Sequence, residues 1–165
     1  MTQELHHEVE LAVALERGGL AISVEEAEAC IFGYAVAIDL TRRDLQQQAK
    51  DARRPWTLAK GGDGSAPIGL LHRTETAGHP RRGGIWLEVD GERRQAGDLA
   101  AQIWQVPEVI AALSAFVRLA PGDLILTGTP AGVGPLRVGN RVRAGIDGLG
   151  ELALSITAPA ATEGA

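Results

Sequence analysis

Short apolar runs separated by glycine-containing turns constrain the fold of this chain more than any other feature. Residues 9–15 begin as an alternation and then become apolar, and residues 31–38 form a nearly continuous apolar run that is typical of a buried strand. Further strands are expected at residues 85–89, 92–95, 124–126, 140–146 and 151–157. The 21 glycines indicate a turn-rich chain. The pattern predicts a mixed, β-rich (α+β) fold, a roll or barrel-like sheet with a few short helices, rather than a doubly wound sheet.

Local signals predict the turns and helices between these runs. Asp90 and Gly91 separate two strand-like segments and predict a hairpin. Ser23 and Glu26 have the spacing of a capping box, which predicts a short helix that ends near Ala29. Further helices are expected at residues 41–54 and 107–119, and loops at residues 61–69 and, exposed to solvent, 72–84.

Composition and charge exclude several classes of protein. The 16 basic and 21 acidic residues give a net charge of −5, so there is no electrostatic reason to bind nucleic acid or an anionic membrane. No apolar run reaches the roughly 18 residues of a membrane-spanning helix, and the chain does not begin like a signal peptide. Cys30 is the only cysteine, which excludes an internal disulfide and favours the reducing cytoplasm. We expect one domain over residues 1–157 and a flexible tail over 158–165.

Three carboxylates are candidate metal ligands. Glu8 and Glu10 lie two positions apart, so in a strand they share one face and repel each other unless a cation lies between them. Asp39 follows a buried strand, where a carboxylate is costly to desolvate without a partner. A hard divalent cation with oxygen ligands explains all three. From the residues alone, a solvated strand face for the glutamates and a helix cap for Asp39 remain open.

Two cations and one loop are candidates for substrate binding. Arg43 lies four residues after Asp39, so it is able to bind a substrate carboxylate in a bidentate manner or to be a surface residue. Lys60 lies between an apolar stretch and a glycine-rich loop, where it either stabilises an enolate oxygen or is solvated. The segment 127–134 places glycines after a buried strand, which lets the backbone approach a ligand. It lacks the features of a P-loop or a dinucleotide site.

Taken together, these stretches resemble the fumarylacetoacetate hydrolase family. The resemblance covers roughly residues 5–157, and it is strongest to the small acylpyruvase and oxaloacetate-handling branch. The matching strings are His7-Glu-Val-Glu-Leu11, Asp39-Leu-Thr-Arg-Arg-Asp44, Trp56-Thr-Leu-Ala-Lys60, Asp63-Gly-Ser-Ala-Pro67 and Leu124-Ile-Leu-Thr-Gly-Thr-Pro-Ala-Gly-Val-Gly134.

The resemblance implies a β-roll, a homodimer and a divalent-metal-dependent hydrolase that cleaves a C–C bond in a small 2-oxo acid such as an acylpyruvate or fumarylpyruvate. It implies Mg²⁺ or Mn²⁺ held by Glu8, Glu10 and Asp39. It also implies that the 2-oxo acid contacts Arg43, Gln46, Lys60 and Thr129, with Lys60 and Thr129 stabilising the enolate. Decarboxylation or keto–enol tautomerisation of oxaloacetate is the alternative reaction, and aromatic catabolism is the implied setting. A non-catalytic member that keeps the fold is a further alternative.

One family feature does not carry over to these residues. Family members have a further N-terminal segment with a His and a Glu that activate water on a lid, and neither His6 nor His7 matches that position. Gly62 and Ala66 stand where an aromatic residue and a cysteine are usual. We therefore expect the 165-residue chain to bind oxalate-like 2-oxo acid mimics and to hydrolyse acylpyruvates poorly.

Overall fold

The chain folds into three small antiparallel sheets, as shown by a computed structural model that describes residues 2–158. The sheet orders are β4-β1-β9, β11-β10-β6-β7 and β5-β3-β2-β8. The strands are β1 (Leu5–His7), β2 (Val9–Leu15), β3 (Ile31–Ile38), β4 (Thr41–Arg42), β5 (His72–Arg73), β6 (Gly84–Val89), β7 (Glu92–Asp98), β8 (Leu124–Leu126), β9 (Gly134–Leu136), β10 (Arg141–Ile146) and β11 (Gly150–Ser155). The helices are α1 (Val24–Ala27), α2 (Arg43–Asp51), α3 (Thr57–Lys60), α4 (Thr74–Ala77) and α5 (Val106–Ser114), with 3₁₀ turns at Glu28–Cys30 and Leu99–Ala101.

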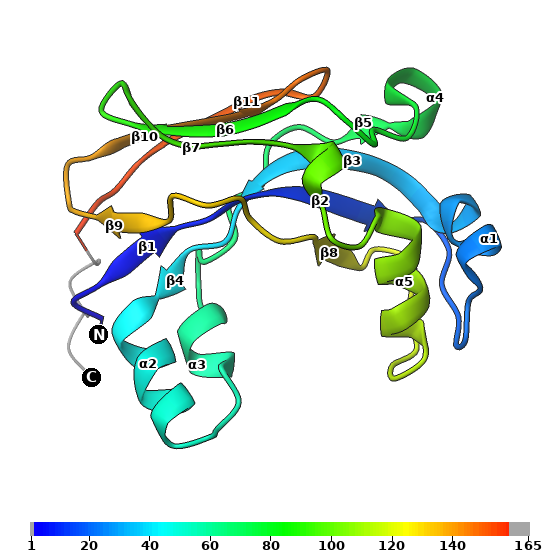
Figure 1. Ribbon diagram of the computed structural model, residues 1–165, viewed down its shortest axis with the longest axis horizontal. Helices are drawn as coiled ribbons and strands as arrows, with labels where there is room; N and C mark the ends of the chain where they lie inside the picture. The colour runs from blue at the N-terminus through cyan, green and yellow to red at the C-terminus, as the bar shows by residue number, and fades with distance from the viewer. Residues whose placement is uncertain (1, 159–165) are drawn as a thin grey trace, which may run out of the picture.

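The core lies between the two four-stranded sheets, which form two layers in Figure 1. Every residue of β2 is buried, and β6 alternates between half-buried and buried positions, because only one of its faces meets the core. The residues that fill this core include Leu11, Val13, Val36, Leu87 and Val142. On the other face of β2 and β3, the small side chains of Ala12, Ala35 and Ala37 form a separate buried cluster. That second face is the one that carries the candidate site.

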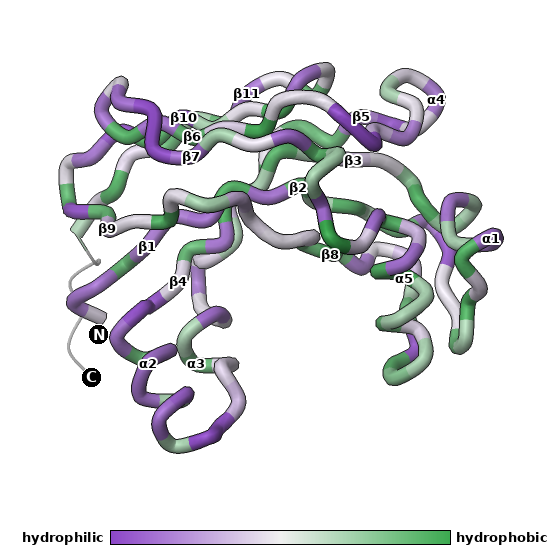
Figure 2. Tube along the Cα trace, viewed as in Figure 1, coloured by the Kyte–Doolittle hydropathy of each residue, from purple (hydrophilic) through white to green (hydrophobic). Residues whose placement is uncertain are grey.

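The helices lie at two ends of this second face. In Figure 1, α2 and α3 lie together below β4 at one end, and α5 lies beside α1 at the other. Figure 2 shows that α2 is largely hydrophilic and that α5 is largely hydrophobic. No helix within residues 2–158 is long and apolar enough to cross a lipid bilayer.

Most of the expected elements are present. The strands expected at residues 9–15, 31–38, 85–89 and 124–126 are confirmed. The hairpin at Asp90 and Gly91 is confirmed as well, and both residues have positive φ. The capping box is also confirmed: Ser23 accepts a hydrogen bond from the Glu26 N–H, and Glu26 accepts one from the Ser23 N–H. The β-rich prediction of a roll with a few short helices is therefore correct.

Four expectations were wrong in detail. The segment 72–84 contains β5 and α4 rather than loop alone, because residues 72–73 pair with the edge of β3. The helix expected over 41–54 covers only Arg43–Asp51, since residues 41–42 pair with β1. The helix expected over 107–119 ends at Ser114, and the strand expected over 151–157 ends at Ser155. All of the predicted tail 158–165 except Ala158 lies outside the described residues.

Candidate metal and substrate site

Three carboxylates converge where β1, β2 and β3 meet. Glu8 separates β1 from β2, so the glutamates do not lie on one continuous strand as the spacing predicted. Pairing of β2 with β3 brings Asp39, just after β3, next to Glu8, whose carbonyl accepts a hydrogen bond from the Asp39 N–H at 2.8 Å. One carboxylate oxygen from each of Glu8, Glu10 and Asp39 lies within 4.8 Å of the others. Glu8 and Glu10 are both buried, which excludes the alternative of a solvated strand face for them.

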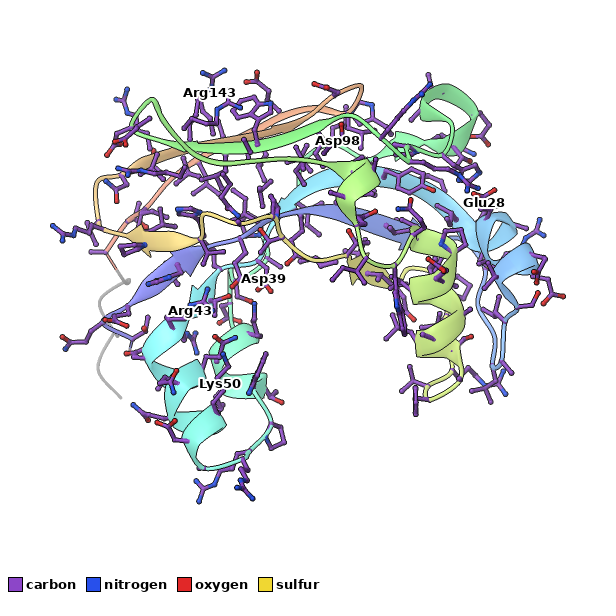
Figure 3. All side chains as sticks on the ribbon, in the orientation of Figure 1. Glu28, Asp39, Arg43, Lys50, Asp98 and Arg143 are labelled. Carbon is purple, nitrogen blue, oxygen red and sulfur yellow. The ribbon has the colours of Figure 1, made fainter. Side chains whose placement is uncertain are left out.

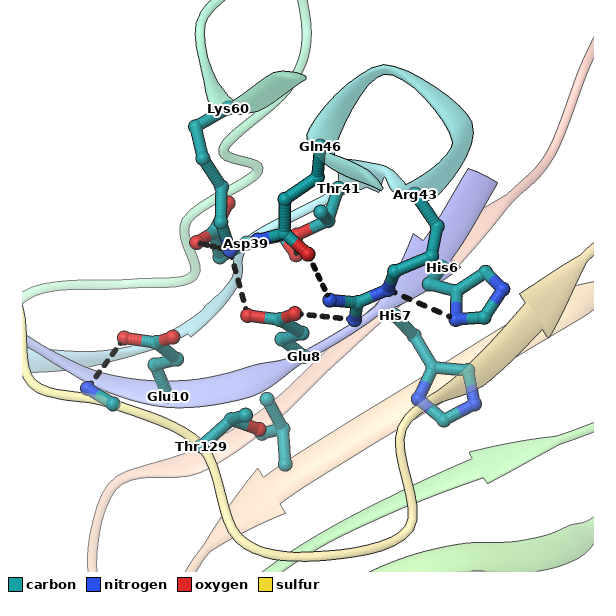
Figure 4. A network of polar contacts seen from close by, with 12 residues as sticks. His6, His7, Glu8, Glu10, Asp39, Thr41, Arg43, Gln46, Lys60 and Thr129 are labelled. Atoms are coloured by element: carbon teal, nitrogen blue, oxygen red, sulfur yellow. Dashed lines mark hydrogen bonds and ion pairs between the residues drawn. The ribbon is translucent and has the colours of Figure 1, made fainter. Parts of the chain in front are cut away.

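Lys60 lies against two of these carboxylates. Its Nζ donates to Glu8 Oε2 at 2.7 Å, to Asp39 Oδ2 at 2.5 Å and to Thr41 Oγ1 at 2.7 Å, so all three ammonium hydrogens are engaged (Figure 4). Burial lowers the pKa of Lys60, but Asp39 and Glu8 outweigh it and hold the pKa above its ordinary value. Burial raises the pKa of Glu8, yet Lys60 and Arg43 outweigh it in the opposite direction. Glu8 and Lys60 are therefore both charged at neutral pH.

Glu10 is the carboxylate whose charge is least compensated. It is 4% exposed, and within residues 2–158 no Lys or Arg forms an ion pair with it. Its Oε2 accepts a hydrogen bond from the Gly128 N–H at 2.6 Å. Burial is the main cause that raises the pKa of Glu10, to about 7, and the negative charges of Asp39 and Glu8 act in the same direction. A cation held by all three groups relieves this penalty.

The donor set fits a hard divalent cation. Three carboxylate oxygens at one place, two of them on buried side chains, are the ligands that Mg²⁺ and Mn²⁺ prefer. The incomplete compensation of Glu10 leaves negative charge for such an ion to neutralise. This geometry is compatible with the expected metal ligation by Glu8, Glu10 and Asp39.

Arg43 lies at the start of α2, on the side of the helix that is near Asp39 (Figure 3). Its Nη2 donates to Glu8 Oε1 and its Nη1 to Gln46 Oε1, both at 2.6 Å, while Nε lies 3.4 Å from His6 Nδ1. Residues three apart on a helix share a face, which is why Gln46 is able to hold Arg43. One hydrogen on each Nη remains without a partner among the described residues, so the guanidinium has two donors left for a ligand.

Thr129 approaches the carboxylates from the opposite side to Lys60, on the loop between β8 and β9 (Figure 4). The structure therefore brings all the predicted site residues together: Glu8, Glu10, Asp39, Arg43, Gln46, Lys60 and Thr129. It also adds residues that the sequence did not indicate. Thr41 is fully buried and accepts from Lys60, and Gln95 donates to Thr129 Oγ1 at 2.8 Å.

The sequence matches a known protein family over nearly its whole length. The family described as Fumarylacetoacetate (FAA) hydrolase C-terminal matches residues 1–157. The chain belongs to the fumarylacetoacetate hydrolase family. A mouse member, oxaloacetate tautomerase FAHD1, mitochondrial, is 43% identical over 147 residues, which cover 89% of this chain and 66% of the mouse protein. The chain thus spans slightly less than two thirds of that relative.

Solved structures of the family support the same assignment. The fumarylpyruvate hydrolase from Pseudomonas aeruginosa, in complex with Mn²⁺ and pyruvate, is 48% identical with a TM-score of 0.93, over 95% of this chain and 67% of that one. The 5-carboxymethyl-2-hydroxymuconate delta-isomerase from Mycobacterium smegmatis is 34% identical with a TM-score of 0.86, over 94% and 60%. Family members with this fold therefore include hydrolases and isomerases, and one of these structures contains Mn²⁺.

Proposed function

We propose that this chain forms the metal and substrate site of an Mg²⁺- or Mn²⁺-dependent hydrolase that cleaves a C–C bond of an acylpyruvate such as fumarylpyruvate. The observation that supports it most is the convergence of Glu8, Glu10 and Asp39 beside Lys60 and Arg43. The Mn²⁺ and pyruvate bound to the 48% identical Pseudomonas hydrolase support the class of ligand. A cytoplasmic location and a role in aromatic catabolism are parts of the same proposal.

The residues of this chain bind and orient the substrate. Glu8, Glu10 and Asp39 would hold the cation, which would supply Lewis acidity to a bound 2-oxo acid. Arg43 donates its two remaining N–H groups to the substrate carboxylate, and Gln46 keeps the guanidinium in place. Lys60 and Thr129 donate to the oxygen on which negative charge develops as the C–C bond breaks. Because all three Lys60 hydrogens are engaged, the substrate oxygen must replace one of its present partners.

Keto–enol tautomerisation of oxaloacetate is the second candidate reaction, and its decarboxylation is chemically close to it. The 43% identity to a mouse oxaloacetate tautomerase favours it. Both reactions pass through an enolate of a 2-oxo acid, so the same cation, Lys60 and Thr129 serve either one. The reactions differ in whether a water must be activated, since only hydrolysis requires a general base for that water.

Oxalate, which resembles the enolate of pyruvate, tests the proposed site. We expect calorimetry to show one oxalate per chain in the presence of Mg²⁺ or Mn²⁺, with binding lost after chelation by EDTA. Assays with fumarylpyruvate and with oxaloacetate, in parallel, then assign the reaction. Equal oxalate affinity with and without metal would contradict the proposed site. Cleavage of fumarylpyruvate without any tautomerisation of oxaloacetate would reject the second candidate.

The proposal includes a homodimer. The chain's own core uses part of the apolar face of residues 106–117, since Val106 and Ile110 are buried. Large apolar side chains remain exposed at both ends of α5: Ile103 at 97%, Trp104 at 54%, Phe116 at 88% and Val117 at 53%. Exposed apolar surface of this kind commonly marks an interface between proteins.

We expect light scattering at micromolar concentration to give about twice the chain mass of 17.3 kDa. Phe116→Asp places a charge on the exposed apolar surface, so we expect it to shift the mass toward that of one chain. Leu70→Asp, at a side chain that is 76% exposed on the loop before β5, is the matched control and should leave the mass unchanged. A wild-type mass near 17 kDa would show that the chain is a monomer.

A further inference from the structure

A buried amide connects the two halves of the candidate site. Gln95 lies on β7 and is 1% exposed. Its Oε1 lies 2.9 Å from His7 Nδ1 and 3.1 Å from the Val9 nitrogen, the two residues that flank Glu8. Its Nε2 lies 2.8 Å from both Thr129 Oγ1 and the Pro130 carbonyl oxygen. One side chain therefore contacts both the strand junction that carries Glu8 and the loop that carries Thr129.

Backbone partners fix which way this amide points. The Val9 N–H is able only to donate, so Gln95 Oε1 must lie on that side. The Pro130 carbonyl is able only to accept, so Nε2 must lie on the other. All four hydrogen-bonding positions of the amide are then filled, and a buried amide with complete partners has no low-energy alternative. It follows that His7 Nδ1 carries a hydrogen and that Thr129 Oγ1 accepts from Gln95.

The direction of that last hydrogen bond determines what Thr129 is able to do. A hydroxyl oxygen that accepts from an amide keeps its own hydrogen for another partner. Among the described residues the structure gives Thr129 no acceptor for that hydrogen. We propose that Gln95 is a positioning residue, which holds the Thr129 hydroxyl as a donor toward the oxygen of a bound 2-oxo acid. This inference rests on the proposed function, because it requires that such an acid binds beside Thr129.

A double-mutant cycle with Gln95→Met and Thr129→Val tests this role. Methionine has nearly the shape of glutamine, adds no charge and removes the amide, while valine replaces the threonine hydroxyl with a methyl group of similar size. The readout is oxalate affinity by calorimetry at saturating Mg²⁺, with the thermal midpoint of each variant measured in parallel. A hydrogen bond to a charged group accounts for roughly a 10- to 100-fold change in affinity. We expect each single variant to lose at least about 10-fold and the double variant to lose no more than Thr129→Val alone.

The outcomes separate this inference from the proposed function. If Gln95→Met weakens oxalate equally with Thr129 or Val at position 129, its role is structural and the inference is wrong. Unchanged affinity in Gln95→Met would also overturn it. If wild type binds no oxalate with metal, the proposed function fails, and the inference fails with it. Should Gln95→Met not fold, Gln95→Asn takes its place in the cycle, because it keeps a buried amide that is too short to reach both sides.

Discussion

Glu10→Gln should abolish detectable binding of Mg²⁺ or Mn²⁺, with an affinity at least about 100-fold below that of wild type. The amide has the size of the carboxylate but removes one of three anionic oxygens from a site with few other donors. Loss of one charged ligand leaves two carboxylates whose charges Lys60 and Arg43 already balance. Calorimetric titration of chelator-treated protein measures this directly. Glu25→Gln, the same change at an exposed position on α1, is the matched control and should bind as wild type does.

Measuring the stability of Glu10→Gln tests whether a loss of metal binding comes from misfolding. Glu10 has a folded pKa of about 7, above its unfolded value, so its favourable contribution is present below about pH 4.5 and is lost as the pH rises through 7. Without metal, the wild type therefore carries an unfavourable charge at pH 8 that the glutamine variant lacks. We expect the variant to be at least as stable as wild type at pH 8 without metal. Comparable metal affinity of the two proteins would show that Glu10 is not a ligand.

Lys60→Met should separate metal binding from substrate binding. The variant keeps the three carboxylates and removes the ammonium that contacts Glu8, Asp39 and Thr41. Metal affinity should be equal or higher, because a competing positive charge is gone. Oxalate affinity at saturating metal should fall about 10- to 100-fold, the usual range for loss of a charge-assisted hydrogen bond. Turnover of the 2-oxo acid should fall by roughly 10²–10³, as for other oxyanion donors.

Lys50→Met is the control for that experiment. Lys50 lies on α2 with its ammonium 5.1 Å from the centre of the Trp56 ring, and it makes no contact with the three carboxylates. The control variant should bind oxalate and turn over substrate as wild type does. If Lys60→Met retains wild-type oxalate affinity, the proposed contact between Lys60 and the ligand does not exist. If it loses metal instead, Lys60 supports the metal site rather than the substrate.

The longer strands could be predicted from the sequence because each one is an apolar pattern within a short stretch of residues. β2 and β3 read as apolar runs, and Asp90-Gly91 has the residues that a tight hairpin requires. The short strands β1, β4 and β9 could not be predicted in this way. They have two or three residues each, and they exist only because segments distant in sequence pair at the site, such as Leu5 with Arg42 and with Leu136. The family resemblance placed these segments in one site without predicting their pairing.

Some residues of the candidate site could likewise be recognised in the sequence, and others only in the structure. Glu8, Glu10 and Asp39 were recognisable as unusual carboxylates, although spacing alone left a solvated face and a helix cap open. Gln95 was not recognisable, because β7 is mostly polar and exposed and its glutamine looks like a surface residue. Only the fold brings Gln95 to His7 and Val9, which lie 88 and 86 positions away. Nothing in the sequence of residues 92–98 separates Gln95 from its polar neighbours, and only the structure shows that it alone in β7 is buried.

The most direct test of the metal site is the anomalous scattering of Mn²⁺ in crystals of the protein grown or soaked with MnCl₂ and oxalate. The proposed site predicts one strong anomalous peak per chain, in contact with carboxylate oxygens of Glu8, Glu10 and Asp39. It also predicts oxalate density between that peak and the side chains of Lys60, Arg43 and Thr129. A peak at any other place, or no peak among these carboxylates at saturating Mn²⁺, would contradict the assignment of this site.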